Sequence, residues 1–86
     1  MDVFVYFYEP LPCGVDEIED ALDKALRDAG EVTGSGVGAK GSNVDIFISD
    51  ESLPVARVVD LVRQALLPIH LPESSRIVVG GRKFEI

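Results

Sequence analysis

The sequence predicts an α+β fold whose strands and helices follow one another in βαββαβ order, with a short β-hairpin at the C-terminus. Two segments have the 3.6-residue hydrophobic period of amphipathic helices, and extended apolar segments lie before, between and after them. A chain of 86 residues has room for one domain with a small core, so we expect residues 1–86 to form a single domain.

The first extended segment, residues 2–9, has β-branched and aromatic side chains at both parities, which predicts a strand inside the sheet. Either parity could face the core. We prefer Val3, Val5 and Phe7 on the core side, because the opposite parity contains two tyrosines, whose hydroxyl groups favour water or a partner.

Residues 14–29 have the period of a helix with one apolar stripe. The stripe consists of Val15, Ile18, Leu22, Ala25, Leu26 and Ala29. Carboxylates crowd the first turns, whereas Lys24 and Arg27 come later, as the helix dipole favours. We expect Gly30 to end this helix in the left-handed conformation.

Residues 31–37 and 43–49 predict two strands of a β-hairpin, joined by a turn at residues 39–42. Gly34 and Gly36 in the first strand indicate a bulge or an edge position. The second strand alternates, and its expected core side consists of Val44, Ile46 and Ile48.

The second helix is expected at residues 53–69, with Ser52 as its N-cap and Pro54 in its first turn. Its apolar stripe consists of Val55, Val58, Val59, Val62, Ala65, Leu66 and Ile69. Gly80-Gly81 then separates two short apolar segments, 76–79 and 82–86, which indicates a tight hairpin.

Right-handed crossovers interleave two βαβ units into an antiparallel sheet with both helices on one face, which is the ferredoxin-like sandwich. The first and third strands are central in that layout. The face without helices then presents four aromatic side chains, Phe4, Tyr6, Tyr8 and Phe47. Exposed apolar patches mark interaction sites and aromatic residues are enriched at binding hot spots, so we expect these four residues to bind a partner.

The net charge of −7 would repel a polyanion, so we expect no nucleic-acid partner. We expect no membrane partner either, because no apolar run approaches the roughly 20 residues that span a bilayer. No segment has the pattern of a signal peptide, which makes the cytoplasm the expected location. The single cysteine, Cys13, has no second cysteine to form a disulfide or a zinc pair.

No group of residues has the pattern of an active site. The glycine run 34–38 follows a helix and leads into a strand, whereas a phosphate-binding loop opens a helix. His70 has only Glu73 near it in sequence, and Cys13 precedes four carboxylates that disfavour a thiolate. Those carboxylates, Asp16, Glu17, Glu19 and Asp20, lack the spacing of a calcium loop. We therefore expect no catalytic residue, no cofactor and no metal site.

The stretch Gly30-Glu31-Val32-Thr33-Gly34-Ser35-Gly36, followed by Asn43-Val44-Asp45-Ile46-Phe47-Ile48, resembles a group of short bacterial proteins of ferredoxin-like fold. In these uncharacterised proteins a GEVTGxG hairpin leads to a DIxI-type strand between two helices. The resemblance spans nearly the whole chain and implies the fold, and it implies no activity.

The expected function is that of a non-enzymatic protein-interaction module. It would bind a protein partner or a second copy of itself through the open sheet face, an edge strand, or both. Its most concrete form is an acidic antitoxin or immunity-type protein that neutralises a basic partner, since opposite potentials speed encounter. The main alternative is a small-molecule-sensing regulatory domain that works as a homodimer, and a small enzyme using His70 or Cys13 is the remaining one.

Overall fold

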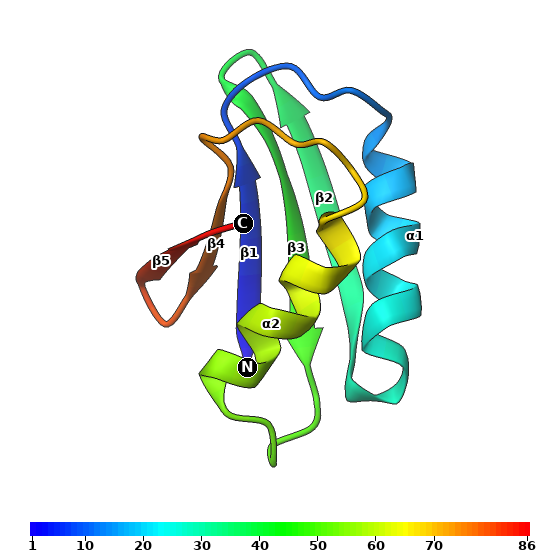
Figure 1. Ribbon diagram of the computed structural model, residues 1–86, viewed down its shortest axis with the longest axis vertical. Helices are drawn as coiled ribbons and strands as arrows, with labels where there is room; N and C mark the ends of the chain where they lie inside the picture. Colours follow the sequence, from blue (N-terminus) through cyan, green and yellow to red (C-terminus); the bar gives the residue numbers. More distant parts are fainter.

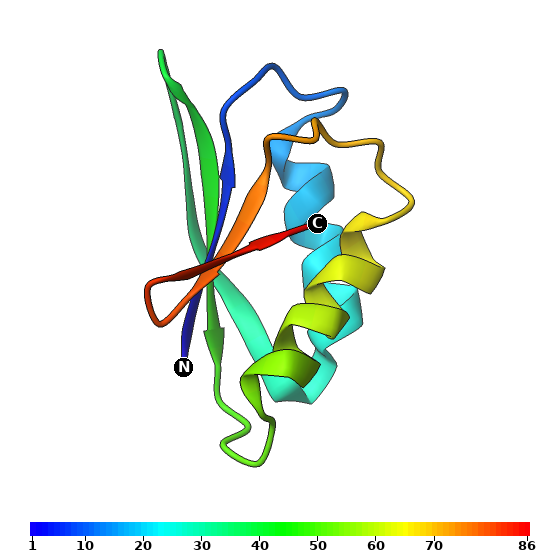
Figure 2. The same cartoon turned by 60° about the vertical axis from the view of Figure 1, so that its left-hand side comes forward.

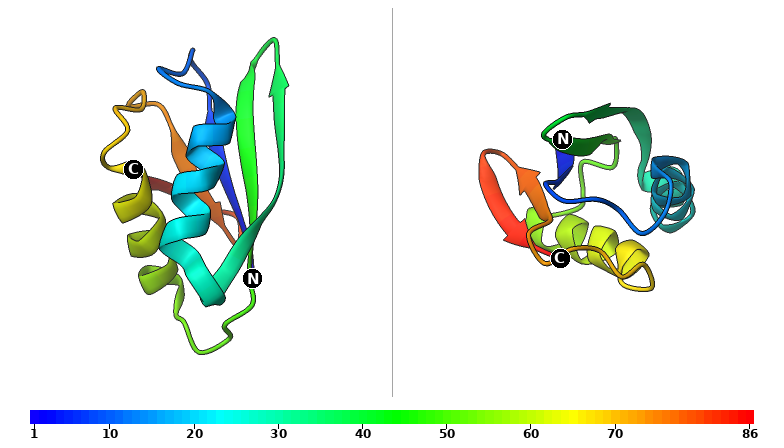
Figure 3. Two further views of the ribbon diagram at one scale, coloured as in Figure 1. Left: turned by 90° about the vertical axis from the view of Figure 1, so that its right-hand side faces the viewer. Right: turned by 90° about the horizontal axis from the view of Figure 1, so that it is seen from above.

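The computed structural model describes residues 1–86 and consists of a five-stranded sheet and two α-helices (Figure 1). The elements are β1 (Asp2–Phe7), α1 (Val15–Leu26), a 3₁₀ helix (Arg27–Ala29), β2 (Gly30–Gly38), β3 (Gly41–Ile48), α2 (Val55–Leu66), β4 (Arg76–Val79) and β5 (Arg82–Glu85). Both helices cover the same face of the sheet and leave the other face open (Figures 2 and 3). The fold class is therefore α+β, as predicted.

The strand order across the sheet is β2-β3-β1-β4-β5, and every neighbouring pair is antiparallel. The sheet thus has one strand more than the four of the basic layout, because the C-terminal hairpin adds β5 beside β4. Gly80 and Gly81 form the two-residue turn of this hairpin with φ angles of 57° and 78°, as their sequence predicted. The arrangement is compatible with a ferredoxin-like fold, and β1 is the middle strand of the five.

The core lies between the sheet and the two helices. The preferred parity of β1 is confirmed, because Val3, Val5 and Phe7 are buried toward the helices. Leu22 of α1 and Ile46 of β3 are buried with them. The rest of the same cluster consists of Ile18, Leu26, Val44, Ile48, Val58, Val59, Val62, Leu66, Ile77 and Val79. The hydrophobic periods in the sequence therefore predicted the core-facing side of each main element.

Strand β2 lies at one edge of the sheet and its register shifts between Val32 and Gly34, so both predictions from its glycines are confirmed. Helix α1 lies beside this edge and binds it through two carboxylates (Figure 1). The Val32 N–H donates to Asp23 Oδ1 at 3.0 Å, and Ser35 Oγ donates to Glu19 Oε1 at 2.8 Å. These two acidic residues of α1 therefore satisfy polar groups of the edge strand.

The expected role of Gly30 is wrong. Its φ and ψ angles are −176° and −174°, and it is the first residue of β2. Helix α1 ends earlier, at Leu26, and the residue with positive φ is Arg27 at 51°. A Cβ atom on Gly30 would lie 2.5 Å from the carbonyl oxygen of Phe47. The glycine is thus required by the close approach of β2 to β3, and not by the end of the helix.

The second helix is shorter than residues 53–69, and Ser52 is not its N-cap. Pro54 occupies that position with an extended backbone, two residues farther along the chain. The Ser52 side chain and N–H instead donate to the carboxylate of Asp50, with the N–H at 3.0 Å. These two hydrogen bonds hold the pKa of Asp50 below its ordinary value, the side-chain bond having the larger effect.

Candidate functional site

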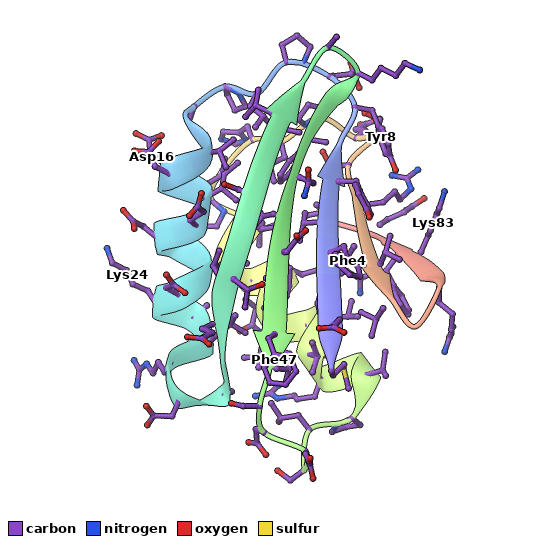
Figure 4. All side chains as sticks on the ribbon, turned by 180° about the vertical axis from the view of Figure 1, so that it is seen from behind. Phe4, Tyr8, Asp16, Lys24, Phe47 and Lys83 are labelled. Atoms are coloured by element: carbon purple, nitrogen blue, oxygen red, sulfur yellow. The ribbon has the colours of Figure 1, made fainter.

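The open face of the sheet carries a column of three aromatic rings on β1 and just beyond it (Figure 4). Phe4 and Tyr6 stack with ring centroids 6.2 Å apart, and Tyr6 and Tyr8 stack at 6.4 Å. Tyr8 is 49% exposed, whereas Phe4 and Tyr6 are half-buried because each ring shields its neighbour. We call Phe4, Tyr6 and Tyr8 the aromatic column. It is an ordered apolar surface on the middle strand that neither helix covers.

Phe47 lies on the same face but apart from the aromatic column (Figure 4). It is 41% exposed and pairs across the strands with Asp2, whereas the residue opposite Phe4 is Asp45. By this register Phe47 is a diagonal neighbour of Phe4, one open-face position along β3 from Asp45. The stacked pairs join Phe4, Tyr6 and Tyr8 and do not include Phe47.

Polar and acidic side chains border the aromatic column on the β3 and β2 side. Asn43 stands opposite Tyr6, and its Nδ2 donates to Asp45 Oδ1 at 2.9 Å, which holds the Asp45 carboxylate in place. Glu31 of β2 stands opposite Phe47, and Asp2 of β1 lies on the other side of Phe47. We call Asp2, Glu31 and Asp45 the acidic flank.

Basic side chains border the aromatic column on the β4 and β5 side. Arg76 stands opposite Tyr6, and its guanidinium donates to the carbonyl oxygens of Glu73 at 2.7 Å and Ser75 at 2.8 Å. Lys83 of β5 stands opposite Val78, which in turn is opposite Phe4. We call Arg76 and Lys83 the basic flank. Glu85 of β5 stands opposite Arg76 and is the acidic residue on this side. The open face is therefore polarised across β1, with acidic residues on the β3 and β2 side and a net positive charge on the β4 and β5 side.

These two flanks were not predicted from the sequence. Their residues are far apart along the chain, and only the strand order and register bring them beside the aromatic column. The sequence nevertheless indicated which face of β3 these residues occupy. Asn43, Asp45 and Phe47 alternate along β3 with the buried residues, and therefore point to the open face. Combined with the predicted order of the strands, this alternation places Asp45 on the open face of a strand beside β1, and only the register sets it opposite Phe4.

Most of the net charge of the chain lies elsewhere, on α1. Five carboxylates and one lysine give this helix −4 of the −7 carried by the chain. Seen from the open face, helix α1 lies beside the β2 edge of the sheet (Figure 4). Much of the acidity that the composition predicts is thus concentrated on α1, and the open face itself has both signs of charge.

The C-terminal hairpin extends the sheet and does not cover the open face. From its turn, β5 crosses toward the helix side of the sheet (Figure 2). At its end, Arg63 Nε of α2 donates to the carbonyl oxygen of Glu85 at 2.8 Å, and Ile86 packs against the core. The aromatic column is therefore left without cover by any other part of the chain.

The surface of the protein has three hollows. Two of about 470 Å³ each lie at the turn between β2 and β3, and Tyr8 lines both. One of them also contains Cys13 and the start of α1, whereas the other contains Tyr6 and Asn43. The third, of about 190 Å³, lies beyond the end of α2 and contains His70. The two residues considered for catalysis thus lie in different hollows and are not brought together.

The thiol of Cys13 is disfavoured as a nucleophile. Burial raises its pKa above the ordinary value, and a hydrogen bond with Glu17 and the negative charges of Glu17 and Asp16 raise it further. His70 is exposed, and no hydrogen bond to a neighbouring side chain orients its imidazole. The expectation that nearby carboxylates work against a thiolate agrees with this arrangement.

Alkylation of Cys13 should accordingly be slow. At pH 8 we expect a smaller rate constant with iodoacetamide than for a small free thiol, because a raised pKa leaves less thiolate. The rate should rise with pH along a curve displaced to the alkaline side, and Glu17→Gln should move that curve back toward lower pH. The Cys13→Ser variant has no thiol and gives the background rate of the assay. A rate at pH 8 equal to that of the free thiol would contradict the assigned environment.

The acidic residues near the start of α1 do not gather around a common point. The structure contains no group of three or more histidine, cysteine or carboxylate side chains placed to hold a metal ion. Neither α-helix has both the length and the apolar character that crossing a membrane requires. No protein-family model, curated protein or solved structure matches this chain.

Proposed function

We propose that this chain is a non-enzymatic protein-interaction module of ferredoxin-like fold, extended by β5, and that its recognition surface is the open sheet face. The observation that supports this function is the aromatic column, whose stacked rings stand uncovered on the middle strand. Monomeric proteins seldom leave a contiguous apolar surface of this kind without a use, and tyrosine is enriched at binding hot spots.

The surroundings of the aromatic column fit a protein partner. Polar and charged side chains border it on both sides, and several are held by hydrogen bonds before any partner binds. An apolar centre with a polar rim is the usual anatomy of a protein–protein interface. Side chains that are ordered in advance lose less conformational entropy on binding.

Site-specific photo-crosslinking tests this function. A photoreactive phenylalanine analogue replacing Tyr8 should give covalent adducts with protein in the cells that make the chain. The same analogue replacing Leu67 is the matched control, because Leu67 is 75% exposed at the end of α2 and lies outside the open face. Adducts at position 8 but not at 67 are the expected result. An equal, low yield at both positions would mean that the open face binds no protein.

A role as an acidic antitoxin or immunity-type protein is the second candidate, and the charge of α1 favours it. Asp16 and Asp20 are exposed on this helix, which would attract a basic partner at low salt. In this case charge reversal at Asp16 and Asp20 should abolish binding of the partner, whereas Tyr6→Glu should not.

The hollows at the β2–β3 turn favour the small-molecule-sensing alternative, because Tyr8 connects them to the aromatic column. A metabolite bound there would raise the melting temperature with increasing concentration, since it would bind the folded chain only. A thermal-shift screen therefore separates this alternative from a module that binds protein alone.

A further inference from the structure

We infer that the open face binds a second copy of this chain, in a face-to-face homodimer whose twofold axis runs along β1. This inference rests on the proposed function and specifies its partner. Three features of the open face carry it: the distribution of charge, the symmetry of the strand order about β1, and the sizes of the side chains on the two outer strands.

The charge of the open face fits a partner that also has both signs of charge. A strongly basic protein would meet Arg76 and Lys83 on one side of the aromatic column, and a strongly acidic one would meet Asp45 and Glu31 on the other. Because −4 of the net charge is on α1, which lies beside the β2 edge and not on the open face, little of this charge would lie between two copies that meet at this face. A second copy supplies both signs.

The strand order makes this complementarity specific. Two strands lie on each side of β1, with the acidic flank mainly on β3 and β2 and the basic flank on β4 and β5. A half-turn about an axis along β1, between the two sheets, places β3 of one protomer against β4 of its partner and β2 against β5. Asp45 and Glu31 then lie on the side of the partner's basic flank, in both halves of the interface. Asp2, the third residue of the acidic flank, is on β1 and lies near the axis, close to the partner's Asp2.

The strand register determines which residues of the two copies lie at the same height along the axis. Asp45, Phe4, Val78 and Lys83 stand in one row across the sheet, and rotation about an axis along the strands leaves that row at the same height. Asp45 thus lies over the partner's Val78, one strand away from the partner's Lys83, whose long stem can reach it. An axis across the strands at the height of Asp45 would instead place β3 on β3 and bring the two Asp45 carboxylates together, which like-charge repulsion disfavours.

The outer strands also match in side-chain size. Gly34, Gly36 and Gly38 occupy the open-face positions of β2 beyond the bulge, whereas β5 presents Lys83 and Glu85 there. The fold itself does not require glycine at position 34, because a Cβ atom there would meet nothing nearer than Asp45 Oδ2 at 3.9 Å. A strand without side chains at these positions leaves room for the long side chains of the partner's β5.

The aromatic column lies on the proposed axis, so each of its rings would meet the column of the partner. Facing sheets pack about 10 Å apart with their side chains interdigitated, which is close enough for such ring contacts. Offset aromatic pairs contribute beyond the area they bury. The apolar centre of the interface would therefore be built from Phe4, Tyr6 and Tyr8 of both copies.

Sedimentation velocity over a range of concentrations tests the dimer. The wild-type chain should sediment as a dimer that dissociates on dilution, and Tyr6→Glu should raise the dissociation constant by more than about 100-fold, because it removes the ring contacts at the axis and brings two carboxylates together there. Leu67→Glu is the matched control and should leave the dimer unchanged. Gly34→Gln, at a position with free space, should also weaken the dimer while the monomer stays folded by circular dichroism.

A charge exchange tests the position of the axis. Asp45→Lys and Lys83→Asp should each raise the dissociation constant about tenfold, because each alters two contacts per dimer. The double variant should bind nearly as tightly as the wild type, since the two signs are then exchanged together. Neither position belongs to the core, so the monomer should remain folded in all three variants.

A wild-type chain that stays monomeric at every concentration would overturn the homodimer, as would a dimer that survives both Tyr6→Glu and Gly34→Gln. A double variant as weak as the single ones would overturn the axis along β1. The photo-crosslinked adduct at position 8 separates these failures from failure of the proposed function. An adduct with a different protein would refute the homodimer and support the module, whereas an adduct with the mass of two copies supports both.

Discussion

Replacing Ile46 with alanine is expected to lower the free energy of unfolding by about 2–5 kcal/mol. Ile46 is 1% exposed on β3, where it pairs with Val3 of β1 on one side and Val32 of β2 on the other. Alanine would lose the transfer free energy of the removed atoms and leave a cavity that the surrounding strands cannot fill. For a domain whose total stability is about 4–13 kcal/mol, this is a large fraction.

Leu22→Ala should have an effect of similar size, because Leu22 is fully buried on the face of α1 that packs on the sheet. Leu67→Ala is the control: Leu67 is 75% exposed, and its truncation should change stability by no more than about 0.5 kcal/mol. Urea unfolding followed by circular dichroism measures all three. An unchanged midpoint for Ile46→Ala or Leu22→Ala would mean that the packing of the sheet against the helices is wrong.

Replacing Gly41 with alanine should destabilise the fold nearly as much. Gly41 begins β3 with a φ angle of 133°, a conformation that side chains rarely adopt, and such backbone strain alone costs about 1–3 kcal/mol. A Cβ atom would also collide with the carbonyl oxygen of Phe7, where the end of β1 passes close to β3. The variant must therefore either strain the backbone or separate the two central strands.

Gly80→Ala is the matched control for this prediction. Gly80 also has a positive φ angle, 57°, but a Cβ atom there would meet nothing within 4 Å. Gly80→Ala should therefore lower the free energy of unfolding only by the cost of the left-handed conformation, about 1–2 kcal/mol. Urea unfolding should therefore rank Gly41→Ala as the more destabilised variant. Equal losses would show that the contact with Phe7 relaxes without cost.

The positions of the helices and the faces they bury could be predicted from the sequence because both depend on local periodicity. The stripe through Ile18, Leu22 and Leu26 has a period of 3.6, and it is buried as expected. The same holds for Val44, Ile46 and Ile48 with a period of 2. The aromatic column also follows from local pattern, since the buried parity of β1 leaves Phe4, Tyr6 and Tyr8 on the other face.

Features that depend on a second strand were predicted wrongly or not at all. Gly30 follows a helix, and its position suggested a helix terminator, but the backbone of Phe47 on β3 determines its role. Phe47 has the correct parity, yet its neighbours across the sheet are Asp2 and Glu31, so it lies outside the aromatic column. Neither the close approach of Gly30 to β3 nor the cross-strand neighbours of Phe47 can be predicted from the residues next to them in the sequence.

The sequence by itself determined the α+β class, the composition of the core and the presence of exposed aromatics on the first strand. These properties follow from hydrophobic periodicity, which acts within each helix or strand. Only the tertiary structure decided which charges border those aromatics. Asp45 and Lys83 are 38 residues apart in the chain, and the register of three strand pairs places them in one row. Backbone hydrogen bonding sets that register, and it joins residues without regard to their separation in sequence.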